Sequence, residues 1–392
     1  MSLKVKLVAS LAVLSLVLGA CGSKEEGTTS TKSNTEQKET NKKEEAAEKE
    51  EASYGDSFKE AVAELEKAKE GKEVDYDKVT KIYEDNLKEL VQKRDQELED
   101  TMDQTITTAL QAGKDGSLDK VVVKQIFDKL MQKVFYTTMK HEFKEVAENW
   151  GKPEAVKEEM EEAKEFYSII QSTVEKRDAA YGTSMKDAID GGFAEMEKAI
   201  EANDQLGFQL GKQVVDKTIM KTFYLATGAF PNGYATKAAN KAKEDAEAAK
   251  VEQSEGWAFF QSIKSYIAKH SPEEAALIEK QFDLQSDVKA IDPEAINKAF
   301  VRGFAKVALD EYTESIESWG EDKAVITGLE GALFIDIIGS DLKASLGEEG
   351  YKALAEKAQA YVDATKAKDK AAGEKLFNEL KASLQSVIDS AK

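Results

Sequence analysis

The sequence predicts an all-α fold, built from about four internally repeated helical units that stack as one or two bundles after a disordered tether. Apolar residues recur at the spacing of one helix face over most of the chain. Only four prolines occur in 392 residues, while Ala, Glu, Lys and Leu, which favour helix, are abundant. Segments of the sequence also recur at intervals that hold two or three helices, as in stacked helical repeats.

The first helical runs are predicted over residues 76–112 and 118–150. Gly113 and Gly116 lie between the two runs, and glycine commonly follows the last turn of a helix. Pro153 suits the first turn of a third run, which extends to about residue 180. No segment shows a convincing strand pattern, so we expect helices throughout the folded part.

Glycine and proline residues predict further helix ends downstream. These residues are Gly191-Gly192, Pro231 with Gly233, Pro272, Pro293, Gly320, Gly339 and Gly347. Ser271 and Asp292 each stand before a proline and are predicted N-caps, with Glu274 completing a capping box after Ser271. The Ala-, Lys- and Glu-rich stretch 234–251 is expected to form one long exposed helix where two bundles divide.

The clearest internal repeat lies in the middle of the chain. Residues 124–136 match residues 212–224 without a gap, with seven identities in thirteen positions. A second match joins Val91-Gln-Lys-Arg-Asp95 to Val174-Glu-Lys-Arg-Asp178. Each of these shorter segments precedes its longer partner by a similar distance, so the two matches indicate one repeating unit.

A looser repeat occurs three times and marks where the units begin. Glu162, Glu255 and Glu330 are each followed by a phenylalanine four residues later and an isoleucine four residues after that. With a degenerate first copy near Val79, these positions predict four units of two or three helices each. One such unit cannot bury its own apolar stripe, so neighbouring units must stack.

The N-terminus has the pattern of a signal peptide. Lys4 and Lys6 precede an apolar stretch of about a dozen residues, shorter than the ~20 that cross a bilayer. The following Leu18-Gly19-Ala20-Cys21 closely resembles the lipobox of bacterial lipoproteins. The resemblance implies cleavage before Cys21, acyl chains on that cysteine, and a lipid anchor on the outer face of the bacterial cell membrane.

These patterns divide the chain into four predicted regions. Residues 1–20 are the signal peptide, and residues 21–53 are the lipidated cysteine with a tether rich in Lys, Glu, Ser and Thr. The tether has no large apolar residue, so it cannot bury enough surface to order itself. Residues 54–240 and 241–392 are predicted as two helical lobes.

Net charge limits the partners. The formal net charge is −20, which argues against nucleic acid or anionic lipid headgroups as ligands, because both require a basic surface. The expected partners are the lipid bilayer, reached through acylated Cys21, and either a cell-surface protein or a cation. No cofactor is predicted.

The repeated glutamates are the main candidate site residues. Glu162, Glu255 and Glu330 each lie one helical turn from a core aromatic residue, so they point toward the interior or its edge. Buried carboxylates need partners. Arg94 and Arg177, two of only three arginines, occupy equivalent repeat positions and suit such pairing. The alternatives are structural ion pairs, a carboxylate cluster that binds a cation or small ligand, and simple exposure of these glutamates to solvent.

Other catalytic or metal-binding patterns are scarce. His141 and Glu145 share a helix face and are weak candidates for a metal site. No Glu-x-x-His pair, His-x-x-x-His, Gly-x-Ser-x-Gly or P-loop pattern occurs. With two histidines and one cysteine in the chain, an enzyme would depend on carboxylates alone, and none is predicted.

The expected function is therefore non-enzymatic binding or scaffolding at the cell surface. The first alternative is an extracytoplasmic receptor for a metal ion or small ligand in an uptake system. Iron is included among the metals because Gly328-Leu-Glu-Gly331 looks slightly like the Arg-Glu-Gly-Leu-Glu signature of iron permeases, although the arginine is missing and the order differs. The second alternative is a carboxylate-based enzyme.

Overall fold

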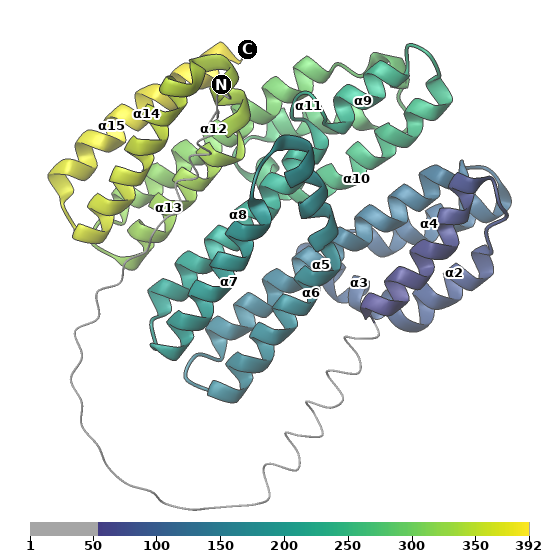
Figure 1. Ribbon diagram of the computed structural model, residues 1–392, viewed down its shortest axis with the longest axis horizontal. Coiled ribbons are helices and arrows are strands. Elements are labelled where there is room, and N and C mark those ends of the chain that lie inside the picture. Colours follow the sequence, from purple (N-terminus) through teal and green to yellow (C-terminus); the bar gives the residue numbers. More distant parts are fainter. Residues whose placement is uncertain (1–53, 392) are drawn as a thin grey trace, which may run out of the picture. The chain divides into compact units, whose positions relative to one another are not determined.

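Caps and glycines determine where the helices begin and end. The computed structural model describes residues 54–391, and every regular element in that range is a helix, as predicted (Figure 1). Residues 54–66 are helical. The elements that follow are η1 (Lys67–Glu70), α2 (Tyr76–Ile82), the π-helical turn η2 (Tyr83–Leu87), α3 (Lys88–Leu98), α4 (Met102–Asp115), α5 (Lys120–Glu148), α6 (Pro153–Tyr181), α7 (Met185–Glu201), α8 (Gln205–Thr227), α9 (Tyr234–Lys241), α10 (Ala246–His270), α11 (Pro272–Phe282), η3 (Val288–Ala290), α12 (Pro293–Glu317), α13 (Asp322–Ile337), α14 (Gly339–Ala367) and α15 (Lys370–Ser390).

Apart from helix 54–66, α9 and the short η elements, the helices form four units of three, with α2 and α3 counted together, which confirms the repeat prediction. The first helices are α2–α3, α6, α10 and α13; the second are α4, α7, α11 and α14; the third are α5, α8, α12 and α15. In every unit the second and third helices pack against each other. Figure 1 shows α6, α7 and α8 side by side as one such unit. The predicted starts near Val79, Glu162, Glu255 and Glu330 all lie in first helices.

The third helices of the first three units connect them to the units that follow. Helix α5 packs against α6 of the second unit and α10 of the third, and α8 packs in the same way against α10 and α13. Helix α12 packs against α13 and α15. The stacking therefore extends beyond nearest neighbours, and it covers the apolar faces of the long third helices.

The repeated Arg-Asp pair has a structural explanation in its aspartate. Asp95 accepts hydrogen bonds from the backbone amides of Met102 and Asp103, both at 2.8 Å, where α4 begins. Asp178 does the same for α7, accepting from Met185 at 2.7 Å and from the next amide at 2.9 Å. Helix N-termini have unpaired amides, so each aspartate fixes the start of its unit's second helix.

Three helix predictions were wrong. Helix 76–112 is interrupted at Glu99, whose φ of 53° ends α3. Gly191 and Gly192 lie inside α7, where a Cβ on Gly192 would come within 2.7 Å of Val215, so that glycine allows α7 and α8 to approach closely. The stretch 234–251 is not one helix, because the chain turns between α9 and α10.

The two predicted proline-side caps differ from each other. Asp292 is an N-cap, since its side chain accepts from the amides of Glu294 and Ala295. Ser271 precedes α11 but makes no side-chain capping bond. Glu274, predicted to complete a capping box, instead forms ion pairs with Arg302 at 3.1 Å and with Lys306 at 2.8 Å.

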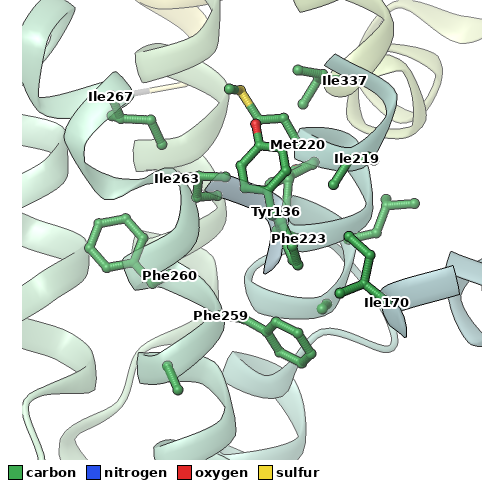
Figure 2. Packing of buried hydrophobic residues seen from close by; sticks show 14 of the residues in the cluster. Tyr136, Ile170, Ile219, Met220, Phe223, Phe259, Phe260, Ile263, Ile267 and Ile337 are labelled. Atoms are coloured by element: carbon green, nitrogen blue, oxygen red, sulfur yellow. The ribbon is translucent and has the colours of Figure 1, made fainter. Parts of the chain in front are cut away.

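The core follows the third helices. Tyr136 on α5 and Phe223 on α8 are fully buried, with ring centroids 5.3 Å apart, and Phe259 of α10 packs on Phe223 at 5.8 Å (Figure 2). The Tyr136 hydroxyl donates to Asp216 at 2.6 Å, so the polar atom of this core tyrosine is satisfied. Three successive units therefore share one apolar interior.

The predicted lobe boundary at residue 240 falls within α9, and α10 beyond it packs on both α5 and α8.

None of the helices between residues 54 and 391 is long and apolar enough to cross a bilayer. The predicted signal peptide, Cys21 and the tether lie outside the described residues.

Candidate functional site

A cavity of about 450 Å³ lies where the first three units meet, and we call it the open pocket. Helix 54–66 and α5 form one side, α6 another, and α9 with α10 the third. This volume falls within the range of small-molecule sites. The charged side chains that line it are six cations, Lys59, Lys69, Lys124, Lys129, Lys176 and Arg177, and three carboxylates, Glu66, Asp128 and Glu255. The excess of positive charge is notable in a chain whose net charge is −20.

Lys129 and Asp128 come from the first copy of the clearest sequence repeat. Asp128 accepts hydrogen bonds from Lys129 at 2.7 Å, Lys124 at 3.0 Å and Gln132 at 2.8 Å. Burial acts to raise the pKa of Asp128, but the charges of Lys129 and Lys124 outweigh it and hold that pKa well below its usual range. The Lys129 ammonium also lies 5.2 Å from the ring centroid of Phe259.

Arg177 is the least satisfied charge in the open pocket. It is 9 % exposed, and its Nε and Nη1 atoms are buried without a hydrogen-bond partner among residues 54–391. No carboxylate of those residues lies within ion-pair distance of it, and its guanidinium lies 5.9 Å from the centroid of Tyr234. A buried cation without an anion is costly, so the geometry favours an external anion at this position.

A second group of residues repeats the same arrangement one unit further along, and we call it the closed cluster: Asp216, Lys217, Tyr266, Glu330 and Phe334. Lys217 donates to Asp216 at 2.8 Å, and its ammonium lies 5.3 Å from the ring centroid of Phe334. Its ion pair with Glu330 is 3.0 Å long, and the ring centroid of Tyr266 is 4.7 Å from the ammonium.

The charges of the closed cluster are mutually compensated. Burial disfavours the charged form of Lys217, but Asp216 and Glu330 outweigh it and raise the pKa of the lysine. Next to the cluster, Glu311 accepts a hydrogen bond from the Tyr266 hydroxyl at 3.0 Å. Burial and the charge of Glu330 raise the pKa of Glu311 to about 7.

The two groups correspond position by position. Lys129 aligns with Lys217 in the clearest repeat, and Glu255 with Phe259 aligns with Glu330 and Phe334 in the looser one. Extending the match of Glu162 with Glu255 along α6 and α10, without a gap, aligns Thr173 with Tyr266. The small Thr173 lines the open pocket, whereas its equivalent Tyr266 fills the closed cluster.

The three repeated glutamates have three different surroundings. Glu330 pairs with Lys217, whereas Glu255 lies beside Tyr234, where burial and the charge of Glu255 raise the pKa of the tyrosine hydroxyl. Glu162 lies with Glu142 and Glu159, and their carboxylate oxygens are all within 4.8 Å of one another. The structure therefore does not bring the repeated glutamates together in one site.

Glu142 holds its proton more tightly than an ordinary glutamate does. Burial, the hydrogen bond with Glu159 and the charge of Glu162 raise the pKa of Glu142 well above its usual range. A protonated Glu142 can donate to its neighbours, which relieves the repulsion between adjacent carboxylates. Within residues 54–391 this is the one group of three side chains spaced for a metal ion, and His141 and Glu145 do not belong to it.

The remaining predicted site residues lie apart from the open pocket. Arg94 forms an ion pair with Glu97 through Nη1 at 2.9 Å, although neither Nη1 nor the buried Nε makes a hydrogen bond of good geometry. His141 lies 3.1 Å from the same Glu97 and 3.7 Å from Glu145. These four residues form a local ion-pair network between α3 and α5.

Sequence reasoning selected Arg177 and Glu255 but not Lys129 or Thr173. The signal for Lys129 is its place in the clearest repeat, where it aligns with Lys217. The signal for Thr173 is its alignment with the larger Tyr266. The comparison of the chain with protein-family models, curated proteins and solved structures gives no match.

Proposed function

We propose that the chain is an exported, lipid-anchored protein that binds a small anionic ligand in the open pocket and performs no chemistry on it. The observation that carries the proposal is Arg177, a buried guanidinium with no anion beside it, in a cavity of about 450 Å³ lined by more cations than carboxylates. Arginine recognises carboxylates and phosphates through paired hydrogen bonds, so an anion supplies what this group lacks.

The pocket also has the apolar surface that a small-molecule site needs. Phe58, Tyr234 and Phe259 form part of its wall beside the charged groups. No histidine or cysteine is among the side chains that line it, which favours binding over catalysis. The lipobox resemblance at Cys21 supports an anchored receptor, and Cys21→Ser should release the protein from the membrane fraction.

The test is a binding series on the full-length protein in detergent. Phenylacetate, phenyl phosphate and benzenesulfonate are compared with benzyl alcohol and benzylamine by calorimetry and by the thermal unfolding midpoint. We expect at least one anion to bind with a Kd of about a millimolar or tighter and to raise the midpoint. Arg177→Gln should abolish binding, while Arg94→Gln, at the equivalent repeat position outside the pocket, should leave it unchanged.

Two results would overturn the proposal. One is that none of the anions binds. The other is that divalent cations such as Ca²⁺ or Mn²⁺ stabilise the protein while the anions do not, which would favour a metal receptor instead.

A further inference from the structure

In the closed cluster the chain supplies two carboxylate partners for the buried lysine, Lys217. Glu330 brings one carboxylate to Lys217 at 3.0 Å, while the neighbouring Asp216 already binds the same ammonium at 2.8 Å. The side chain of Glu330 is 12 % exposed, so water contributes little to this ion pair. The lysine therefore has two carboxylate partners, one from its own helix and one from α13.

The equivalent lysine of the open pocket has only the first of these partners. Lys129 binds Asp128 at 2.7 Å, and no second carboxylate between residues 54 and 391 forms an ion pair with it. Glu255, which aligns with Glu330, lies instead beside Tyr234. The position that the Glu330 carboxylate takes in the closed cluster is thus not taken by a side chain of the open pocket.

The apolar part of the closed cluster also lacks its counterpart. The Tyr266 ring stands 4.7 Å from the Lys217 ammonium and 5.2 Å from Phe334. In the open pocket the aligned residue is Thr173, whose hydroxyl donates to Gln132 at 2.7 Å. Replacing a tyrosine by a threonine removes a ring, and the cavity lies at that place.

We infer that the ligand of the open pocket is a carboxylic acid with an aromatic or similarly bulky apolar arm. This inference rests on the proposed function. The ligand's carboxylate takes the place of the Glu330 carboxylate and binds Lys129, with Arg177 as the second cation. Its apolar arm takes the place of the Tyr266 ring and packs on Phe259. The ligand therefore completes in the open pocket what the chain completes by itself in the closed cluster.

The first experiment compares anions that share one arm. Phenylacetate, benzylphosphonate and benzylsulfonate differ only in the acid group, and acetate lacks the ring. We expect phenylacetate to bind the full-length protein about tenfold or more tightly than each of the other three, equivalent to about 1.4 kcal/mol or more.

The second experiment gives the open pocket the residue of the closed cluster. Thr173→Tyr should fill the cavity, lower phenylacetate affinity by about tenfold or more, and leave the unfolding midpoint unchanged or higher. Thr108→Tyr on the exposed face of α4 is the matched control and should bind normally. Lys129→Gln provides a second variant if the tyrosine is not tolerated, and it should lose the preference for carboxylate over sulfonate.

The outcomes separate this inference from the proposed function. If benzylphosphonate binds as tightly as phenylacetate and Arg177→Gln abolishes both, the anion receptor stands and the carboxylate inference is wrong. If a folded Thr173→Tyr protein binds phenylacetate normally, the inferred place of the arm is wrong. If no anion binds at all, both fail.

Discussion

The open pocket and the closed cluster use equivalent lysine, aspartate, glutamate and phenylalanine positions of the repeats, each drawn from three units, yet only the closed cluster is filled. In the closed cluster Glu330 forms an ion pair with Lys217, and the Tyr266 ring packs against the same ammonium. In the open pocket Glu255 lies beside Tyr234 and forms no ion pair with Lys129, and the small Thr173 leaves the space unfilled. The difference teaches that a binding site can form in a repeat array when one unit omits what another supplies.

The comparison is sharpened most by removing each lysine. Lys217→Ala leaves the Glu330 carboxylate buried without its cation, so the free energy of unfolding should fall by about 3 to 5 kcal/mol. Lys129→Ala should cost only about 1 kcal/mol, because water can enter the pocket and Asp128 keeps Lys124. Urea unfolding followed by circular dichroism measures both. Equal losses would show that the two lysines have the same surroundings in solution.

A second difference is the response to pH. The pKa of Glu311 beside the closed cluster is raised to about 7, so the folded state holds this proton more tightly than the unfolded chain. The resulting stability is complete below about pH 4.5 and is lost as the pH rises through about 7. The difference between a pKa of about 7 and the usual 4.5 corresponds to about 3 kcal/mol at most.

Glu311→Gln should remove this part of the pH dependence, so its unfolding midpoint should change less between pH 5 and pH 8 than that of the unaltered protein. The exposed Glu317 on the same helix is the control, and Glu317→Gln should follow the unaltered protein. A Glu311→Gln profile parallel to that of the unaltered protein would contradict the assignment.

The smallest expected effect separates the two repeated arginines. Without ligand, Arg177→Met should leave the free energy of unfolding unchanged or raise it by about 1 kcal/mol, since it removes an uncompensated charge. Arg94→Met should lower it by about 1 kcal/mol, because Glu97 loses one of its two partners, Arg94 and His141. If Arg177→Met proves the more destabilising change, Arg177 has a structural partner and the anion site loses its main support.

Much of the fold could be predicted because helices and repeats leave regular traces in a sequence. Pro153 and Pro293 begin helices as expected. The three repeated glutamates, each with its phenylalanine, mark the first helices of their units. Two errors had local causes. The turn at Glu99 uses a left-handed residue that is not glycine, and Gly192 serves close packing rather than a helix end.

The candidate site was harder to predict, because it depends on which units meet. The Lys129 ammonium contacts the ring of Phe259 on α10, two units further along the chain. Sequence spacing predicts only which residues are neighbours on the same helix. Arg177 was selected for pairing with a repeated glutamate, but it lies on Tyr234 instead. The sequence therefore predicts which face of each helix is buried, but it does not predict which residues of a unit two repeats away contact that face.

Helices α5 and α8 each pack against the two units that follow their own, and this has a consequence for the folding of the chain. In an ordinary array the polypeptide can be shortened at any seam between repeats, since each repeat touches only the next. Here a chain ending after α8 would expose the faces of α5 and α8 that α10 and α13 cover. Among the described helices, truncation or proteolysis between two repeats would therefore expose packed apolar surface. Local opening of the third unit should also loosen the first, so that cooperativity extends further than a single repeat.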